Sequence, residues 1–153
     1  MSASSLRLAT LVPARETTDG TSWDIAAGVV TLALQVGLDG PLGGSSVTAH
    51  HLVLKVIRRS NGGELLRFDV GPSEPRYHYV RDGGSRVSVA YDEAAGGPMW
   101  QWAIGCLRRR LIPMLHFAGH EDIADELRMR DVFPAIDRLE ALHAQLGTEV
   151  RKS

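Results

Sequence analysis

The chain has 153 residues, 44% of them hydrophobic, and its 17 basic and 18 acidic residues leave a formal net charge of −1. This length can bury one proper core, so we expect a single domain over residues 1–147 and a frayed C-terminal tail at residues 148–153. The near-neutral charge argues against nucleic acid as a partner, and the short apolar runs argue against a membrane. The single cysteine, Cys106, excludes an internal disulfide. A single cysteine is typical of a reducing compartment, and the N-terminus shows no signal-peptide pattern. Together these features predict a cytoplasmic protein.

Alternating apolar residues predict strands in the N-terminal part. Residues 6–12 could form a first strand, which Pro13 would end. Residues 23–25 fit either a short helical turn capped by Ser22 or the beginning of the next strand. A period of two predicts that next strand, whose apolar face would consist of Val30, Leu32, Leu34, Val36 and Leu38.

A β-hairpin gives the strongest local signal. Residues 39–46 are rich in Gly, Pro and Ser and predict a loop, after which residues 47–59 read as a long strand with β-branched residues at its centre. The sequence Ser-Asn-Gly-Gly at residues 60–63 supplies the positive-φ positions of a tight turn. We therefore expect residues 64–70 to return antiparallel to the first strand.

Two further strands are predicted at residues 76–81 and 86–91. Short turns rich in Gly and Pro precede them, at residues 71–75 and 82–85. Sequential strands joined by short turns make an antiparallel meander, here of four to six strands. One face of such a sheet must be covered to bury its alternate apolar residues.

The apolar period becomes helical after Gly97. Pro98 suits the first turn of a helix, Pro113 should kink or split this helix, and Gly119 should end it. The apolar stripe expected on the helix consists of Met99, Trp100, Trp102, Ala103, Cys106, Leu107 and Leu111.

Two more helices are predicted near the C-terminus. Residues 121–130 begin with acidic residues and finish with arginines, as the helix dipole favours. Asp131 is the expected N-cap of the last helix and Gly147 its stop. The apolar stripe of that helix should be Val132, Phe133, Ile136, Leu139, Leu142 and Leu146. The predicted fold class is α+β: an N-terminal antiparallel β-meander of four to six strands, covered on one face by two to three C-terminal helices.

Residues 65–81 carry the candidate site. Strand alternation places Arg67 and Asp69 on one face. If the register brings His78 beside them, the three form a polar cluster in which the carboxylate orients the imidazole and the guanidinium stabilises charge. The turn alone does not fix that register. An ordinary ion pair on the solvent face of the sheet, with no function, is the preferred interpretation of Arg67 and Asp69.

Further ligand-binding residues are expected around this hairpin. Arginine suits carboxylate or phosphate groups, and one of the two tryptophans at positions 100 and 102 could line a cleft against the sheet. His51 could reach His78 only if their strands were near neighbours. The predicted ligand-binding residues are Arg67, Arg76, Tyr77, Tyr79, His51 and Trp100.

The sequence shows no strong metal, cofactor or nucleophile motif. His116 and His120 have the spacing of a zinc-binding helix, but Gly119 should end that helix first and Phe117 stands where the motif needs Glu. The serines lie mostly in expected turns, and Cys106 falls on an apolar stripe typical of a buried residue. We predict neither a metal nor a cofactor.

Two functions agree with these features. The preferred one is a small, soluble, bacterial-type binding module whose sheet–helix cleft or face receives a small anionic ligand or a protein partner. The alternative is a metal-independent acid/base enzyme, an isomerase, cyclase or hydrolase, with His78 as acid or base, Asp69 orienting it, and Arg67 or Tyr79 stabilising charge. A homodimer through an uncovered sheet edge is also expected. The sequence does not decide whether the chain is an enzyme.

Overall fold

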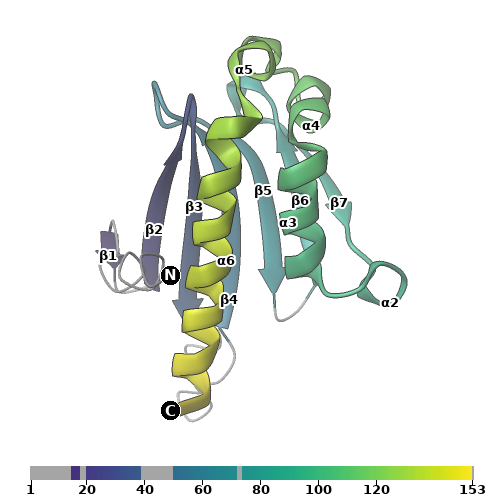
Figure 1. The fold of residues 1–153 in the computed structure, drawn as a ribbon. Helices are drawn as coiled ribbons and strands as arrows, with labels where there is room; N and C mark the ends of the chain where they lie inside the picture. Colours follow the sequence, from purple (N-terminus) through teal and green to yellow (C-terminus); the bar gives the residue numbers. More distant parts are fainter. Residues whose placement is uncertain (1–14, 18–19, 39–49, 72–73, 153) are drawn as a thin grey trace.

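The computed structural model describes residues 15–17, 20–38, 50–71 and 74–152, and the strand predicted at residues 6–12 lies outside this part. Within it, seven strands form one antiparallel sheet in the order of the sequence (Figure 1). These are β1 (Arg15–Thr17), β2 (Gly20–Ala27), β3 (Val30–Leu38), β4 (His50–Arg58), β5 (Glu64–Gly71), β6 (Arg76–Val80) and β7 (Arg86–Ala90). Each strand pairs with its neighbours in sequence, so the sheet is the predicted antiparallel meander, with seven strands among the described residues where four to six were expected.

Residues 23–25 belong to a strand of their own, which corrects both interpretations of that segment. They lie in β2, which pairs antiparallel with β3 up to the pair of Ala27 and Val30. Between these two residues the chain reverses at Gly28, whose φ of +70° lies in the left-handed region. Glycine at the first position of a two-residue turn is typical of a type II′ hairpin. A single glycine therefore makes the turn.

The hairpin predicted around residues 60–63 is confirmed. Gly62 has a φ of +75°, and its N–H donates to the carbonyl oxygen of Arg58 at 2.8 Å. The N–H of Arg58 in turn donates to the carbonyl oxygen of Gly63 at 2.7 Å. This turn joins β4 to β5 in antiparallel register.

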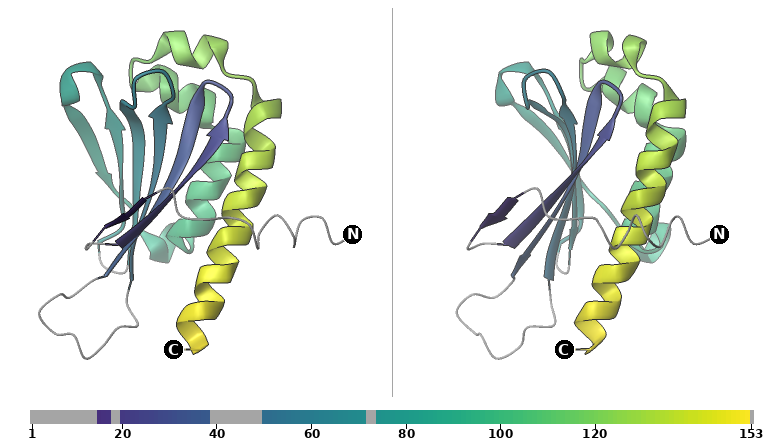
Figure 2. Two further views of the ribbon diagram at one scale, coloured as in Figure 1. Left: turned by 90° about the vertical axis from the view of Figure 1, so that its left-hand side faces the viewer. Right: turned by 60° about the vertical axis from the view of Figure 1, so that its left-hand side comes forward.

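Helices cover one face of the sheet, which confirms the α+β class. They are α2 (Glu93–Gly96), α3 (Met99–Arg109), α4 (Leu111–Phe117), α5 (Glu121–Glu126) and α6 (Met129–Lys152). Figure 2 shows α3 and α6 on the same side of the sheet, with α4 and α5 at its upper end. None of the described helices lies on the opposite side. We call the side opposite these helices the open face.

Pro113 splits the first long helix as predicted, but the break lies three residues before it. The chain leaves α3 at Arg110, with φ −130° and ψ 5°, because Pro113 has no N–H to continue the ladder and its ring crowds the preceding turn. Gly119 ends α4 with a φ of +92°. The N–H of His120 then donates to the carbonyl oxygen of Leu115 at 2.9 Å, which satisfies the helix terminus.

The two C-terminal helices differ from their predicted bounds. α5 ends at Glu126 because Leu127 adopts an extended conformation and is buried in the core. α6 begins at Met129, so Asp131 lies in its first turn and is not the N-cap. α6 also continues through Gly147 to Lys152, which corrects the predicted stop and makes residues 148–152 helical. A glycine inside a helix costs only about 1 kcal/mol, so it need not end one.

The core lies between the sheet and the two long helices. The sheet contributes mainly alternate residues of β2 to β5, and α3, α4 and α6 contribute their apolar stripes. Fully buried members include Ile25, Leu32, Leu34, Leu54, Leu66, Phe68, Met99, Leu107, Leu115 and Ile136. Phe133 is 43% exposed and therefore does not belong to the predicted stripe of α6.

The edges of the described sheet are β1 and β7. A homodimer through such an edge stays a prediction. Among the described helices, none combines the length and apolar character that crossing a membrane requires.

Candidate functional site

The register of β5 and β6 brings the predicted polar residues together. Arg67 lies opposite His78, and Asp69 lies opposite Arg76. Because Phe68, between Arg67 and Asp69, is buried under the helices, alternation places Arg67, Asp69 and His78 on the open face. The register thus brings His78 beside Arg67 and Asp69, and the three form a cross-strand cluster. The chemical role of this cluster stays a prediction.

A chain of short hydrogen bonds runs through these residues and on to β7. Arg67 Nε donates to Asp69 Oδ1 at 2.7 Å, and Asp69 Oδ2 lies 2.8 Å from His78 Nε2. On the other side of the ring, His78 Nδ1 lies 2.6 Å from Ser88 Oγ. We call Arg67, Asp69, His78 and Ser88 the open-face cluster.

The electrostatics of the cluster keep its carboxylate ionised. Burial alone would raise the pKa of Asp69, but the hydrogen bonds from Arg67 and His78 and the positive charge of Arg67 outweigh burial and lower it. An ionised carboxylate only accepts hydrogen bonds, so Nε2 of His78 must carry the proton shared with Asp69. In the neutral ring Nδ1 is then an acceptor, and it receives the hydroxyl proton of Ser88.

Ser88 is the member that sequence reasoning missed. It lies in β7 between Val87 and Val89, directly opposite His78, although the serines were expected mostly in turns. The signal that could have found it was the alternation of residues 86–91 combined with the short turn before them. A strand serine opposite a histidine is in reach of its ring.

The predicted ligand-binding residues do not gather at one place. Tyr77 and Tyr79 lie on the helix side, where they pack against the core, and the ring of Tyr77 lies 4.8 Å from that of Trp102. Arg76 instead is exposed and lies opposite Asp69 on the open face. The set is therefore divided between the two faces of the sheet and cannot contact one small ligand.

His51 and Trp100 are also separate from the cluster. His51 lies on β4 opposite Gly37 of β3, with β5 between β4 and β6. Trp100 of α3 stacks on His143 of α6, with ring centroids 4.1 Å apart and an interplanar angle of 9°. Burial lowers the pKa of His143, which favours its neutral ring in this stack. Trp100 therefore joins two helices and does not line a cleft against the sheet.

Cys106 is buried in the core, as its place on the apolar stripe predicts. Burial raises the pKa of its thiol to about 11, so roughly a thousandth is thiolate at pH 8. We expect the native protein to react with an aromatic disulfide reagent at least about 100-fold more slowly than the unfolded protein in guanidinium chloride. Absorbance of the released thiolate measures both rates. Equal rates would contradict a buried Cys106.

The described residues contain no group of three or more His, Cys, Asp or Glu side chains placed to hold a metal ion. His116 is exposed, and its Nε2 lies 3.8 Å from Asp125 Oδ1. His120 is buried, and its Nε2 donates to the carbonyl oxygen of Val80 at 2.5 Å. Because Gly119 ends the helix between them, the two rings do not share one helix face.

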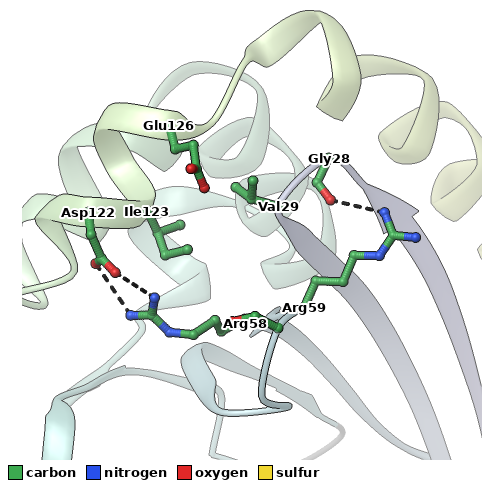
Figure 3. Close-up of a pocket in the computed structure, with 8 residues that line it drawn as sticks. Gly28, Val29, Arg58, Arg59, Asp122, Ile123 and Glu126 are labelled. Carbon is green, nitrogen blue, oxygen red and sulfur yellow. Dashed lines mark hydrogen bonds and ion pairs between the residues drawn. The ribbon is translucent and has the colours of Figure 1, made fainter.

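A cavity of about 480 Å³ lies at one end of the sheet, a volume within the range of small-molecule sites. We call it the end cavity. It lies between the β2–β3 turn, the end of β4 and α5 (Figure 3). Its lining residues are Gly28, Val29, Arg58, Arg59, Ser60, Asp122, Ile123 and Glu126. None of the predicted site residues is among them.

Two arginines at the end of β4 dominate the polar lining of the end cavity. Arg58 forms a two-pronged ion pair with Asp122, at 2.6 and 3.4 Å. This pair lowers the pKa of Asp122, mainly through the hydrogen bond from Arg58. Arg59 Nη1 donates to the carbonyl oxygen of Gly28 at 3.2 Å. Both interactions are visible in Figure 3.

The fold and these two sites define a two-layer α+β protein whose antiparallel meander is covered by helices on one face and carries a polar network on the other. The chain belongs to the family described as Domain of unknown function (DUF7700), whose model matches residues 24–143. The matched part contains both the open-face cluster and the end cavity. Comparisons with curated proteins and with solved structures found no match.

Proposed function

We propose that this protein is a binding module for a small ligand, held in the end cavity. The observation that supports the proposal is a hollow between sheet and helix, lined by the ion pair of Arg58 and Asp122 and by the further charged residues Arg59 and Glu126. The preferred sequence hypothesis expects a ligand in a cleft or on a face between sheet and helices, and we assign the ligand to this hollow. It lies at the hairpin ends of the sheet.

The charges of the end cavity suggest the class of ligand. Arg58 and Asp122 are occupied with each other, so they offer little to a ligand. Arg59 uses one nitrogen on a backbone carbonyl and keeps further N–H donors. The carboxylate of Glu126, which points into the hollow in Figure 3, has no hydrogen-bond or ion-pair partner among the residues that the structure describes. One cation and one anion therefore remain for a ligand.

A small zwitterion matches this pattern. Its carboxylate would bind Arg59, in keeping with the anionic group expected from the sequence, and its ammonium group would bind Glu126. Val29 and Ile123 would contact an aliphatic segment between the two charges. An amino acid with its charges at the two ends of a short chain is the class of ligand that we propose.

The test uses ω-amino acids of increasing length: glycine, β-alanine, γ-aminobutyrate and δ-aminovalerate. We expect one or two members to raise the melting temperature of the protein, because a ligand that binds only the native state stabilises it. The alkyl carboxylates of matching length should give a smaller shift, since they lack the ammonium group. Isothermal titration then measures the affinity of the best member.

Variants of the end cavity complete this test. Arg59→Ala and Glu126→Gln should each weaken binding of the best ligand by about tenfold or more, the loss of one charged hydrogen bond. Glu121→Gln is the matched control, since Glu121 is an exposed residue of the same helix outside the lining. The absence of any shift with the folded protein would overturn the proposed ligand class.

A further inference from the structure

The open-face cluster ends in an exposed hydroxyl group, that of Ser88. We propose that Ser88 is the nucleophile of an acyl-transfer reaction, with His78 as its general base and Asp69 as the carboxylate that orients the base. This inference goes beyond the binding of a ligand in the end cavity. It uses none of the residues that line that cavity, so either proposal can fail while the other stands.

The direction of each hydrogen bond fits this assignment. Asp69, ionised and held by Arg67, accepts the Nε2 proton of His78 at 2.8 Å. Nδ1 consequently faces Ser88 Oγ, at 2.6 Å, without a proton of its own. The base nitrogen is thus ready to receive the hydroxyl proton when the oxygen attacks. Hydroxyl, imidazole and carboxylate follow one another as in a catalytic triad, with the two ring nitrogens exchanged relative to the usual serine protease arrangement.

In nucleophilic catalysis the nucleophile must reach the substrate, whereas the base and its carboxylate can be shielded from water. The exposure of Ser88, His78 and Asp69 follows this pattern. The side chains of His78 and Asp69 are only 10% and 18% exposed, so the base and its partner are largely shielded from water. Ser88 by contrast is exposed and can meet a substrate. If these hydrogen bonds only stabilised the sheet, Ser88 would not need to be more exposed than His78 and Asp69.

The position of Ser88 on an edge strand supplies a donor for the developing oxyanion. Arg81 N–H donates to Ser85 O at 2.8 Å, and Tyr91 N–H donates to Pro75 O at 2.9 Å. Bonded pairs alternate in an antiparallel ladder, so the pair formed by Ser88 and its partner on β6 is a non-bonded one. The N–H of Ser88 therefore points away from β6, and β7 is an edge of the described sheet. A nucleophile's own N–H serves as an oxyanion donor in serine proteases.

Two arginines flank the hydroxyl on the open face and suggest the class of substrate. Arg86 lies two residues before Ser88 on β7, and Arg76 lies two residues before His78 on β6, so all four side chains share one face. Arg76 is exposed, and Arg86 is 39% exposed with its Nη2 3.6 Å from Glu64 Oε2. An ester that carries a carboxylate group matches these charges.

The reaction balances without a metal or redox partner. Ser88 Oγ attacks the ester carbonyl carbon while its proton moves to His78 Nδ1. The bond to the alkoxy group then breaks, the alcohol leaves with that proton, and the acyl group stays on Ser88. Water attacks the acyl-enzyme and gives a proton to His78, which returns it to Ser88 Oγ as the carboxylic acid leaves.

Labelling with a biotin-tagged fluorophosphonate tests the nucleophile directly. The reagent should form a phosphonyl adduct on the peptide that contains Ser88, with loss of fluoride, and mass spectrometry locates the adduct. Ser88→Ala should abolish this labelling, whereas Ser85→Ala, which changes an exposed serine of the same hairpin, should retain it. His78→Phe should slow labelling on the order of 100-fold, the usual contribution of a general base. Circular dichroism checks that each variant is folded.

A folded wild-type protein that forms no adduct at Ser88, or labels Ser85 equally fast, would overturn the assignment. This criterion needs no variant, so it holds even if the His78 substitution prevents folding. The substrate class is tested with two esters, p-nitrophenyl benzoate and the mono-p-nitrophenyl ester of terephthalate, whose carboxylate cannot reach its own ester carbonyl. The rate of spontaneous hydrolysis is subtracted from each. The anionic ester should be hydrolysed faster, and Arg76→Ala should remove that preference. Equal rates for the two esters would overturn the anionic substrate.

Discussion

Phe68→Ala should lower the free energy of unfolding by about 3–5 kcal/mol, the range for deleting a buried phenylalanine ring. Phe68 is 0% exposed, and its ring lies 6.5 Å from that of Tyr77 and 6.2 Å from that of Trp102. The variant loses the buried area and leaves a cavity between β5 and α3 that these large rings cannot fill completely. Urea unfolding at pH 7 measures the effect as a lower midpoint with an unchanged slope.

Phe117→Ala is the matched control, because it removes the same ring from a different environment. Phe117 is 57% exposed, and its ring contacts that of Tyr79 with centroids 4.6 Å apart. We expect a loss below about 1 kcal/mol. Similar losses for the two variants would contradict the assignment of Phe68 to the covered face of the sheet.

The strands from β3 onward could be predicted because their signals are local. Alternation around Leu32 and the turn at residues 60–63 determine strand, face and reversal within a few residues. β2 was missed because its turn contains one glycine, Gly28, with no second turn residue beside it. The break at Leu127 could not be predicted either. It depends on burial of that side chain in a core formed by distant segments.

The open-face cluster and the end cavity also differ in how much of each could be predicted from local sequence. The sequence named three members of the open-face cluster because they lie within twelve residues of each other, and only the register remained undecided. Ser88 needed the register of a second hairpin as well. The end cavity needed the packing of α5 against the hairpin ends, which brings Arg58 to Asp122 across 64 positions of sequence. No local pattern contains that information.

Asp69→Asn should destabilise the protein by about 1–3 kcal/mol at pH 7, since the side chain accepts bonds from two groups that are charged or can become so. Arg67 Nε and His78 Nε2 would then share a neutral amide with one oxygen in place of a carboxylate. Asp24→Asn is the control. Asp24 is an exposed residue of β2 whose carboxylate has no hydrogen-bond or ion-pair partner among the described residues, so its substitution should change stability by less than about 0.5 kcal/mol.

The effect of Asp69→Asn should also depend on pH, with a sign that its pKa determines. Burial opposes ionisation, but Arg67 and His78 prevail, so the native carboxyl has a lower pKa than the unfolded one. The unfolded chain therefore binds the proton more readily. The stabilisation is fully present above the unfolded pKa, about 4, and is lost as the pH falls through the native value. Urea midpoints at pH 7, 5, 4 and 3 should show the wild type approaching the variant on acidification. A difference that stays constant down to pH 3 would mean that the charge of Asp69 contributes nothing, and that the open-face cluster is held by shape and neutral hydrogen bonds alone.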